Sequence, residues 1–159
     1  MLTVRGDLDR AERVLRGAEQ RTAPDGRQLI GGDHGTAIHG VITATLAVAR
    51  GELTASAQAL ARAYAAAVTS EDMPILALVG VGAARLALAR GQYHDAAVLL
   101  GAAGRLRGAE DATDVQIADV TRRIWAAIGP AAFAEAYATG WSLDTATALA
   151  RLHPDQRQL

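Results

Sequence analysis

The chain has 159 residues, of which 50% are hydrophobic and 21% are charged, and its formal net charge is −1. This length and apolar content suit one globular domain with a core, and they exclude a disordered tail. The weak net charge argues against the basic surface that dominates nucleic-acid affinity, so we expect no direct contact with nucleic acid. The absence of cysteine excludes disulfides and thiolate metal sites.

Two features of the apolar pattern bear on localisation. Residues 1–20 alternate charged with apolar residues, which is unlike a secretion signal. The longest apolar run, ILALVGVGAA at 75–84, is about half as long as the ~20 residues that span a bilayer. The sequence therefore predicts a cytoplasmic protein without a membrane contact.

Three segments of the chain share one pattern: RGDLDRAERVLRGA at 5–18, RGELTASAQALARA at 50–63 and RGQYHDAAVLLGAA at 90–103. Aligned on Gly6, Gly51 and Gly91, they repeat with periods of 45 (51 minus 6) and 40 (91 minus 51). Apolar or small residues recur two, five, nine and twelve positions after each glycine. Before the second and third glycines the agreement runs back as far as Gly40 and Gly80, so the sequence predicts structural repeats.

Each repeat has the pattern of a helical hairpin. Ile38, Ile42 and Leu46 recur every four positions, as in a helix with one buried stripe. Gly51 then stands where a helix ends in the left-handed conformation, and a second apolar helical pattern follows it. Small residues at helical spacing predict a close approach of the two helices: Gly40, Ala44 and Ala47 in one unit, and Gly80, Ala84 and Ala87 in the next.

These hairpins resemble the tetratricopeptide repeats (TPRs). The matching residues are Ala44 and Ala84 in the first helix, and glycine followed by Leu53 or Tyr93 at the turn. The chain departs from that family because Gly40 or Gly80 replaces the early aromatic residue, no proline closes the repeats, and both periods exceed the usual ~34 residues. The resemblance implies an all-α, TPR-like α-solenoid of antiparallel helical hairpins with a C-terminal helical cap.

The pattern divides one helical-repeat domain, 1–159, into four parts. We expect a half repeat over 1–20, repeats over 34–70 and 73–107, and C-terminal capping helices over 111–153, with a loop at 21–33. The half repeat lacks a partner helix before Gly6, so one face of it would be uncovered. Two explanations remain open: the chain is a fragment of a larger protein, or it forms a homodimer through the half repeat.

The C-terminal part carries recognisable helix signals. Asp111 or Thr113 is a candidate N-cap for the first capping helix. Pro130 suits the first turn of the next helix, which Gly140 is expected to end. Ser142 is expected to cap SLDTATALARL, and His153 with the following proline is expected to stop it.

This tail resembles the C-terminal end of actinobacterial transcriptional regulators of the AfsR/SARP type, and less specifically that of LuxR/MalT-type regulators. The resemblance covers roughly 75–152 and rests on LLGAAGRLRG at 99–108 and on Gly129, Phe133, Ala136, Tyr137, Ala138, Gly140 and Leu143. In the family, DNA-binding and activation domains, and often an ATPase module, precede a helical-repeat region that senses or docks regulators. The resemblance implies a non-catalytic regulatory module, and a stand-alone adaptor or self-associating scaffold is the alternative.

Motifs for catalysis, metal binding or cofactor binding do not emerge. Asp33, His34 and His39 lie close in sequence and could suggest a metal site. However, a spacing of five residues does not place the two histidines on one face of a helix, so no ligand set forms. We expect a glycine-rich loop with a solvated His34. VGVGAAR at 79–85 lacks the third small residue of a dinucleotide fingerprint and lies in a helical pattern. The sequence therefore predicts neither an enzyme nor a cofactor.

A groove between stacked hairpins is the remaining candidate site. Val41, Thr45, Val81 and Arg85 occupy equivalent positions in the two full repeats and are the candidate groove residues. The predicted ligand is a protein or peptide, or another domain of the same polypeptide.

Overall fold

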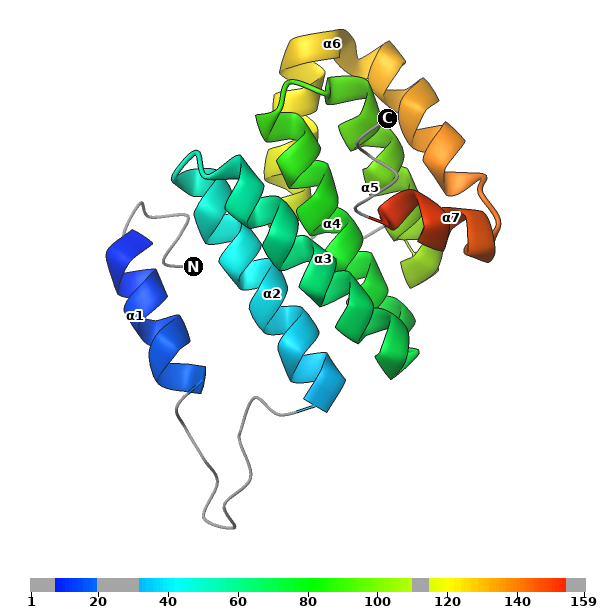
Figure 1. Ribbon diagram of the computed structural model, residues 1–159. Coiled ribbons are helices and arrows are strands. Elements are labelled where there is room, and N and C mark those ends of the chain that lie inside the picture. Colours follow the sequence, from blue (N-terminus) through cyan, green and yellow to red (C-terminus); the bar gives the residue numbers. More distant parts are fainter. Residues whose placement is uncertain (1–7, 20–31, 110–114, 154–159) are drawn as a thin grey trace.

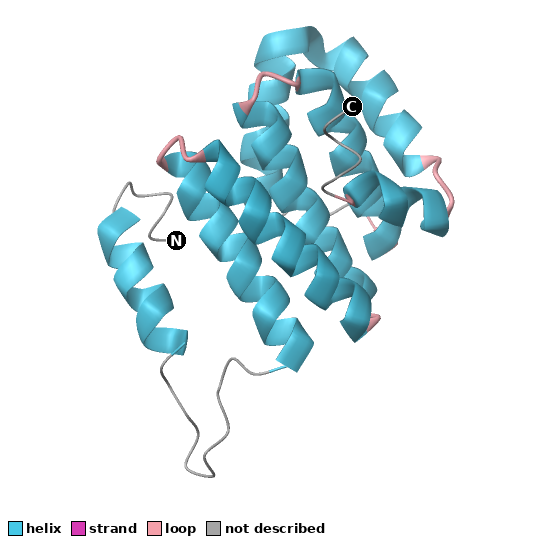
Figure 2. Cartoon of the chain, in the orientation of Figure 1, coloured by secondary structure: helices cyan, strands magenta, loops and turns pink. Residues whose placement is uncertain are grey.

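The computed structural model describes residues 8–19, 32–109 and 115–153, and helices dominate these ranges (Figure 1). The helices are α1 (Leu8–Glu19), α2 (Gly32–Ala49), α3 (Leu53–Ser70), α4 (Met73–Ala89), α5 (Tyr93–Arg107), α6 (Val115–Trp141) and α7 (Thr145–Leu152). Short loops join α2 to α3, α3 to α4, α4 to α5 and α6 to α7, and no strand occurs in the described ranges (Figure 2). The predicted all-α class is confirmed.

The turns between α2 and α3 and between α4 and α5 have the same conformation. Gly51 and Gly91 follow the ends of the first helices with φ of +78° and +75°, in the left-handed region that favours glycine. At each turn the amide three residues past the helix end, Glu52 or Gln92, donates to the carbonyl of Ala47 or Ala87 at 2.9 Å. These bonds satisfy carbonyls that the helix end leaves free, as predicted for glycine-terminated hairpins.

Each hairpin closes on a glycine. A Cβ at Gly40 would lie 2.9 Å from the Cβ of Ala63, and a Cβ at Gly80 would lie 2.8 Å from the Cβ of Ala103. The two pairs are 40 positions apart (80 minus 40 and 103 minus 63), which is the period read from the sequence. The predicted role of small residues in close helix approach is confirmed at these crossings.

The second hairpin packs against the first. In α4, a Cβ at Gly82 would lie 2.8 Å from Leu60 in α3 and 3.5 Å from Val41 in α2. The core between the two hairpins is largely alanine, valine and leucine, with Leu60, Leu76 and Val79 almost fully buried. These small and branched side chains allow the helices to lie close together, side by side in Figure 1.

The α6 helix bends at Gly129, where φ is 81° and ψ is 160°, and Pro130 then opens the second segment as predicted. This segment ends at Trp141, one residue after the predicted end at Gly140, but Gly140 is not a left-handed terminating residue. Gly140 is buried inside the helix, where its Cα faces the backbone of Val98 in α5, and Gly101 of α5 faces the backbone of Tyr137 in α6. These glycines permit two helix backbones to touch, so their role is close packing rather than termination.

The short α7 helix returns to the hairpins. Its N-cap is Asp144, whose side chain accepts from the Thr147 amide, so the predicted cap at Ser142 is wrong. Ser142 instead donates to the carbonyl of Thr139. The helix ends at His153 as expected, and the Tyr64 hydroxyl of α3 donates to the carbonyl of Leu149 at 3.0 Å. The predicted caps Asp111 and Thr113 lie outside the described residues.

The first helix, α1, lies beside α2 and is linked to it by an ion pair. Arg50 Nη2 lies 2.6 Å from Glu12 Oε2. The predicted loop 21–33 is wrong at its end, because Gly32 and Asp33 belong to the first turn of α2. The rest of that loop and Gly6 lie outside the described residues.

Candidate interaction site

Two of the predicted groove residues, Val41 and Val81, are buried. They are 5% and 4% exposed, and Val41 faces Gly82 across the contact between α2 and α4. Val81 lines a small cavity with Leu100 and Tyr137, between α4, α5 and α6. Their assignment to a groove surface is therefore corrected, because the stacking of the hairpins uses these side chains as core.

The other two predicted residues, Thr45 and Arg85, lie together at the edge of the same contact. Arg85 Nη1 donates to Thr45 Oγ1 at 3.3 Å, and Thr45 Oγ1 donates to the carbonyl of Val41 at 2.9 Å. Both side chains are half-buried. The pair joins α2 to α4, so its evident role is to align the hairpins.

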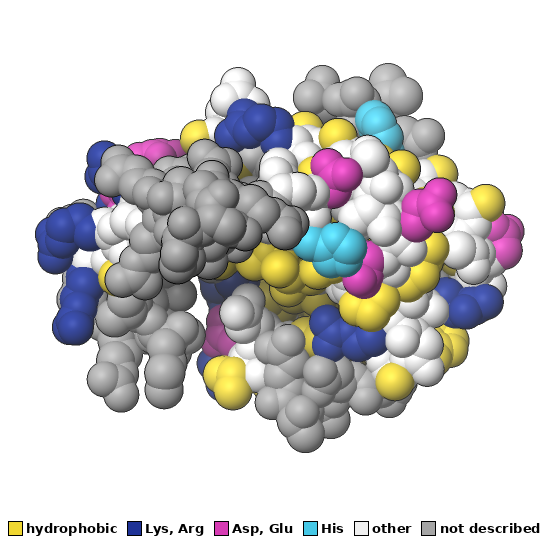
Figure 3. Space-filling view, turned by 90° about the horizontal axis from the view of Figure 1, so that it is seen from below, with side chains coloured by type: hydrophobic (Ala, Val, Ile, Leu, Met, Phe, Trp, Pro, Cys, Tyr) yellow, Lys and Arg dark blue, Asp and Glu magenta, His cyan; other side chains and the backbone are white. Residues whose placement is uncertain are grey.

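A groove of about 260 Å³ lies between α1 and α2. It is lined by Glu12, Leu15, Arg16, His39, Thr43, Leu46, Ala47, Arg50, Glu52 and Ala55. From below, a hollow with hydrophobic side chains in its wall separates the α1 side of the molecule from the rest (Figure 3). The charged residues of the lining are Glu12, its two arginine partners and Glu52.

Two arginines in the groove, Arg16 and Arg50, favour the ionised form of Glu12. Its carboxylate pairs with Arg50 and, at 3.0 Å, with Arg16 one turn along α1. The hydrogen bond from Arg50 is the main cause that lowers the pKa of Glu12 below its usual value. Both partners of Glu12 are solvent-accessible, so the ion pair is a weak link between α1 and α2.

The α1–α2 contact is a more polar version of the α3–α4 contact. Forty positions after His39 and Thr43, the second hairpin has Val79 and Ala83, both fully buried. In the first unit, the Thr43 hydroxyl is buried without a hydrogen-bond partner in the described chain. Polar His39 and Thr43 therefore line the groove where the second hairpin has apolar core residues.

Large apolar side chains are exposed next to this groove. Ile38 and Ile42 on α2 are 39% and 42% exposed, and Val14 on α1 is 58% exposed. The predicted buried stripe of α2 is therefore wrong for Ile38 and Ile42, although Leu46 is 4% exposed and buried as expected. The sequence analysis did not identify these three residues as a site. Its expectation that one face of the half repeat is uncovered was the signal that could have identified them.

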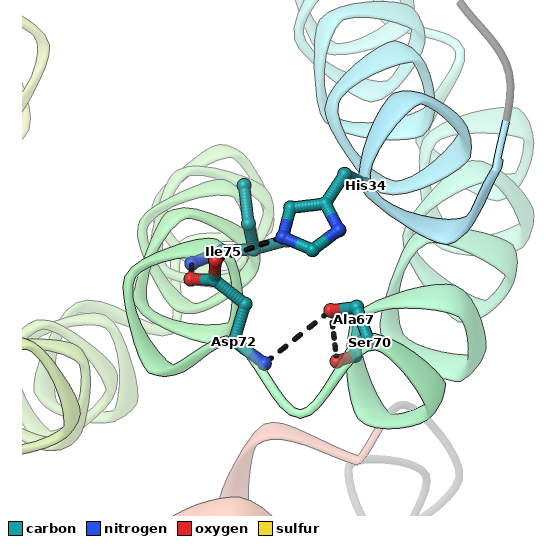
Figure 4. A network of polar contacts seen from close by, with 5 residues as sticks. All are labelled: His34, Ala67, Ser70, Asp72 and Ile75. Carbon is teal, nitrogen blue, oxygen red and sulfur yellow. Dashed lines mark hydrogen bonds and ion pairs between the residues drawn. The ribbon is translucent and has the colours of Figure 1, made fainter.

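His34 does not lie in a loop but in the first turn of α2, where it contacts the start of α4 (Figure 4). Its Nε2 lies 2.8 Å from Oδ2 of Asp72, a carboxylate that sequence reasoning did not associate with it. Asp72 is also the N-cap of α4 and accepts from the amide of Ile75 at 3.1 Å. The contact with His34 and the Ile75 amide lower the pKa of Asp72.

The arrangement around His34 is suited to joining helices rather than to metal binding. Ser70 Oγ accepts from the Asp72 amide at 3.4 Å and donates to the carbonyl of Ala67 at 2.8 Å (Figure 4). Across the described residues, no group of three or more histidine, aspartate or glutamate side chains is placed to hold a metal ion. His39 lies on another face of α2, in the α1 groove.

The glycine-rich run at 79–85 forms part of α4, where Gly80 and Gly82 serve helix crossings. Among the helices of the described ranges, none is both long and apolar enough to cross a membrane. Comparison of the chain with protein-family models, with curated proteins and with solved structures found no match.

Proposed function

We propose that this chain is a non-catalytic protein-interaction module, built as a TPR-like solenoid. The support is the recurrence, at a spacing of 40 residues, of the turn glycines Gly51 and Gly91 and of the crossing glycines Gly40 and Gly80. Hairpins that repeat in this way bury their faces against neighbours and leave faces free at the ends of the stack.

The observation that carries an interaction role is the exposed apolar face beside α1. Val14, Ile38 and Ile42 are accessible next to a groove of about 260 Å³. Exposed apolar side chains that adjoin a groove with a polar rim are typical of protein-interaction sites. The site favours a peptide or protein ligand.

We further infer that the module belongs to a cytoplasmic transcriptional regulator of the AfsR/SARP type. The support is the resemblance of the tail around LLGAAGRLRG, at 99–108, to the C-terminal end of such regulators. In this proposal the module docks or senses a partner that controls a DNA-binding region elsewhere in the polypeptide. The module itself does not contact DNA, in keeping with its net charge of −1.

The regulator proposal is tested by the size of the native polypeptide and by a transcription reporter. An antibody raised against this chain should detect a band several times larger than 16.5 kDa in a lysate of the source organism. Deleting the region from the native gene should then change transcription of the reporter. A native band near 16.5 kDa, or an unchanged reporter, would contradict the proposal.

A stand-alone adaptor or self-associating scaffold is the second candidate. The exposed apolar residues on α1 and α2 favour it, because self-association would cover them. Light scattering of the isolated chain tests the self-associating form: a concentration-dependent dimer supports the scaffold, and a monomer counts against it.

A further inference from the structure

We propose that α7 is an autoinhibitory helix: it occupies a helix-docking site on α3, α4 and α5, and a ligand helix with the same contact residues binds there when α7 is displaced. The α7 helix and α1 lie on opposite sides of the hairpins (Figure 1). The site is therefore additional to the groove beside α1, and its test does not depend on that groove.

The α7 helix lies on the hairpins as a peptide lies on a docking surface. Residues 142–144 join it to α6, but it packs on α5 and α4, and Tyr64 of α3 also contacts it. Ala148 and Leu152 are fully buried, whereas residues 145–147 are exposed. One face of α7 is thus held by helices that precede α6 in the chain, and the other face meets solvent.

The first contact that defines the site is the seat of Leu152. Its two δ carbons lie 3.1 and 3.2 Å from the position that a Cβ at Gly80 would take, so the leucine fills space that only a glycine leaves open. At the equivalent glycine of the first hairpin, Gly40, the three nearest atoms all belong to α3. Gly80 therefore accommodates α7 in addition to its crossing with α5.

The second contact recognises the C-terminal end of a helix. The last four carbonyls of an α-helix have no amide partner within the helix, and Leu149 carries the first of these in α7. The amide of His153 donates to the carbonyl of Ala150, and the Tyr64 hydroxyl donates to that of Leu149 at 3.0 Å. Because every residue has a backbone carbonyl, Tyr64 recognises a helix end rather than a particular side chain.

The third contact is an ion pair at the edge of the site. Arg151 Nη2 lies 2.6 Å from Asp95 Oδ1 of α5, and the two side chains are 40% and 48% exposed, so the pair adds little stability. The N-cap bond from Thr147 to Asp144 lies within the segment and does not attach it.

The attachment of α7 therefore depends mainly on its two buried side chains and the Tyr64 hydrogen bond. A helix of 8 residues is too short to persist alone in water, so α7 stays helical only while it is docked. Segments with few buried contacts open at a lower free energy than the core. We expect α7 to open while the hairpins remain folded.

These contacts define the ligand as a helix that ends in the pattern Ala-x-x-Arg-Leu. The alanine and the leucine take the places of Ala148 and Leu152, the arginine pairs with Asp95, and a free carbonyl of the last turn accepts from Tyr64. The α7 of a second copy gains no contact by exchange that it lacks in its own chain. The ligand is therefore a partner helix with this pattern, and it competes with an α7 whose short tether gives a local concentration on the order of millimolar.

The test uses the full chain and a fluorophore-labelled peptide with the sequence of residues 142–153 as the stand-in for the ligand helix. Leu152→Asp in the chain should release α7, because it places a charge in an apolar seat. Fluorescence anisotropy should then show that the peptide binds this variant at least about tenfold more tightly than the wild type, whose site is occupied. Adding Tyr64→Phe should weaken the binding to the variant by about fivefold, since it removes the hydrogen bond to the helix end.

Two controls accompany the binding measurement. A peptide with aspartate at the position of Leu152 should not bind, and Val115→Asp in the chain, at a valine of α6 that is 68% exposed, should behave as the wild type. Amide hydrogen exchange of Leu152→Asp should be faster than that of the wild type in residues 145–152 and unchanged in α3 to α5, which shows that the hairpins are retained.

Three results would overturn the proposal. They are an absence of saturable binding of the peptide to the Leu152→Asp chain, equal affinities for this variant and the wild type, and exchange that becomes equally fast in α3 to α5 and in α7. The last would make α7 an integral part of the core. Because the native band and the reporter involve neither the peptide nor α7, a failure here is distinguishable from a failure of the proposed function.

Discussion

Arg85 donates a hydrogen bond to Thr45 across 3.3 Å and so joins the equivalent residues of two hairpins, 40 positions apart (85 minus 45). The Thr45 hydroxyl in turn donates a hydrogen bond to the carbonyl of Val41 in its own helix. Val41 is buried beside this pair, where it faces Gly82 of α4. The contact between the hairpins therefore combines an apolar centre with a polar link at its edge.

The first prediction tests that link by a double-mutant cycle. Arg85→Ala and Thr45→Val should each lower the free energy of unfolding, and their coupling should be about 1 kcal/mol, the usual net contribution of a hydrogen bond. Urea denaturation of the wild type, the two single variants and the double variant measures it. Arg105→Ala, at an exposed arginine of α5, is the control and should change the free energy of unfolding little. If the effects of the substitutions at 45 and 85 are additive, the hydrogen bond between them contributes no net stability.

The second prediction concerns the glycines where helix backbones touch. Gly101→Ala should destabilise the protein by about 2 kcal/mol or more, because the new Cβ meets the backbone of Tyr137 in α6 and neither helix can yield without losing core contacts. Thermal or urea unfolding measures the loss.

Gly17→Ala is the control for that experiment. Gly17 lies in α1, where a Cβ would meet nothing within 4 Å, so alanine should stabilise the helix by about 0.5–1 kcal/mol. Equal effects of the two substitutions would contradict the close packing of α5 on α6.

The third prediction is a pH dependence at Asp72. The contact with His34 and the amide of Ile75 lower the pKa of Asp72 in the folded state below the unfolded value of 3.8. The ionised carboxylate therefore adds stability that is fully present above pH 3.8 and is lost as the pH falls through the folded pKa.

Comparison with Asp72→Asn isolates this contribution, because asparagine still caps a helix but cannot ionise. Urea unfolding at a series of pH values should show the wild type more stable at pH 6, with the difference shrinking below pH 3.8. His34→Ala should reduce the difference. If the difference in free energy of unfolding between the wild type and Asp72→Asn is constant from pH 6 to pH 2, the ionised carboxylate is not its source.

The fourth prediction concerns the attachment of α1. Arg50 and Glu12 link α1 to α2 over a partly hollow contact, so Glu12→Gln should loosen the attachment of α1 slightly while the hairpins remain folded. Amide hydrogen exchange should become faster in residues 8–19 and stay unchanged in α3 to α5. Arg122→Ala, which removes the ion pair of Arg122 with Asp119 on α6, should leave exchange in α1 as it was. Faster exchange throughout the chain would mean that α1 is part of the cooperative core.

Local features were predictable from the sequence because their causes lie within a few residues. The turns at Gly51 and Gly91 need a left-handed residue, and Gly129 followed by Pro130 interrupts a helix whatever surrounds it. The spacing of 40 residues also predicted that Gly40 and Gly80 would occupy equivalent crossings. The all-α class and the hairpins follow from such signals.

The errors arose where a residue's role depends on a distant helix. Gly140 lies one residue before the end of α6, as the sequence nearly predicted, but its role there is to let the backbone of α5 approach closely. Ser142 and Asp144 are both acceptable caps, and in the fold Asp144 caps α7 while Tyr64 of α3 contacts that helix. The sequence could not reveal these outcomes because they depend on which backbones meet.

The candidate site shows the same division. Periodicity placed Val41, Thr45, Val81 and Arg85 at equivalent positions, and it also placed Ile38, Ile42 and Leu46 on one stripe. Periodicity identifies the face of a helix but not what covers it. The packing of α4 on α2 buries Val41, and the packing of α5 and α6 around α4 buries Val81, whereas Ile38, Ile42 and Val14 stay exposed. Whether a side chain is buried depends on which distant residues pack against it. The tertiary structure therefore determined which of these residues form the surface, and the repeat pattern could not.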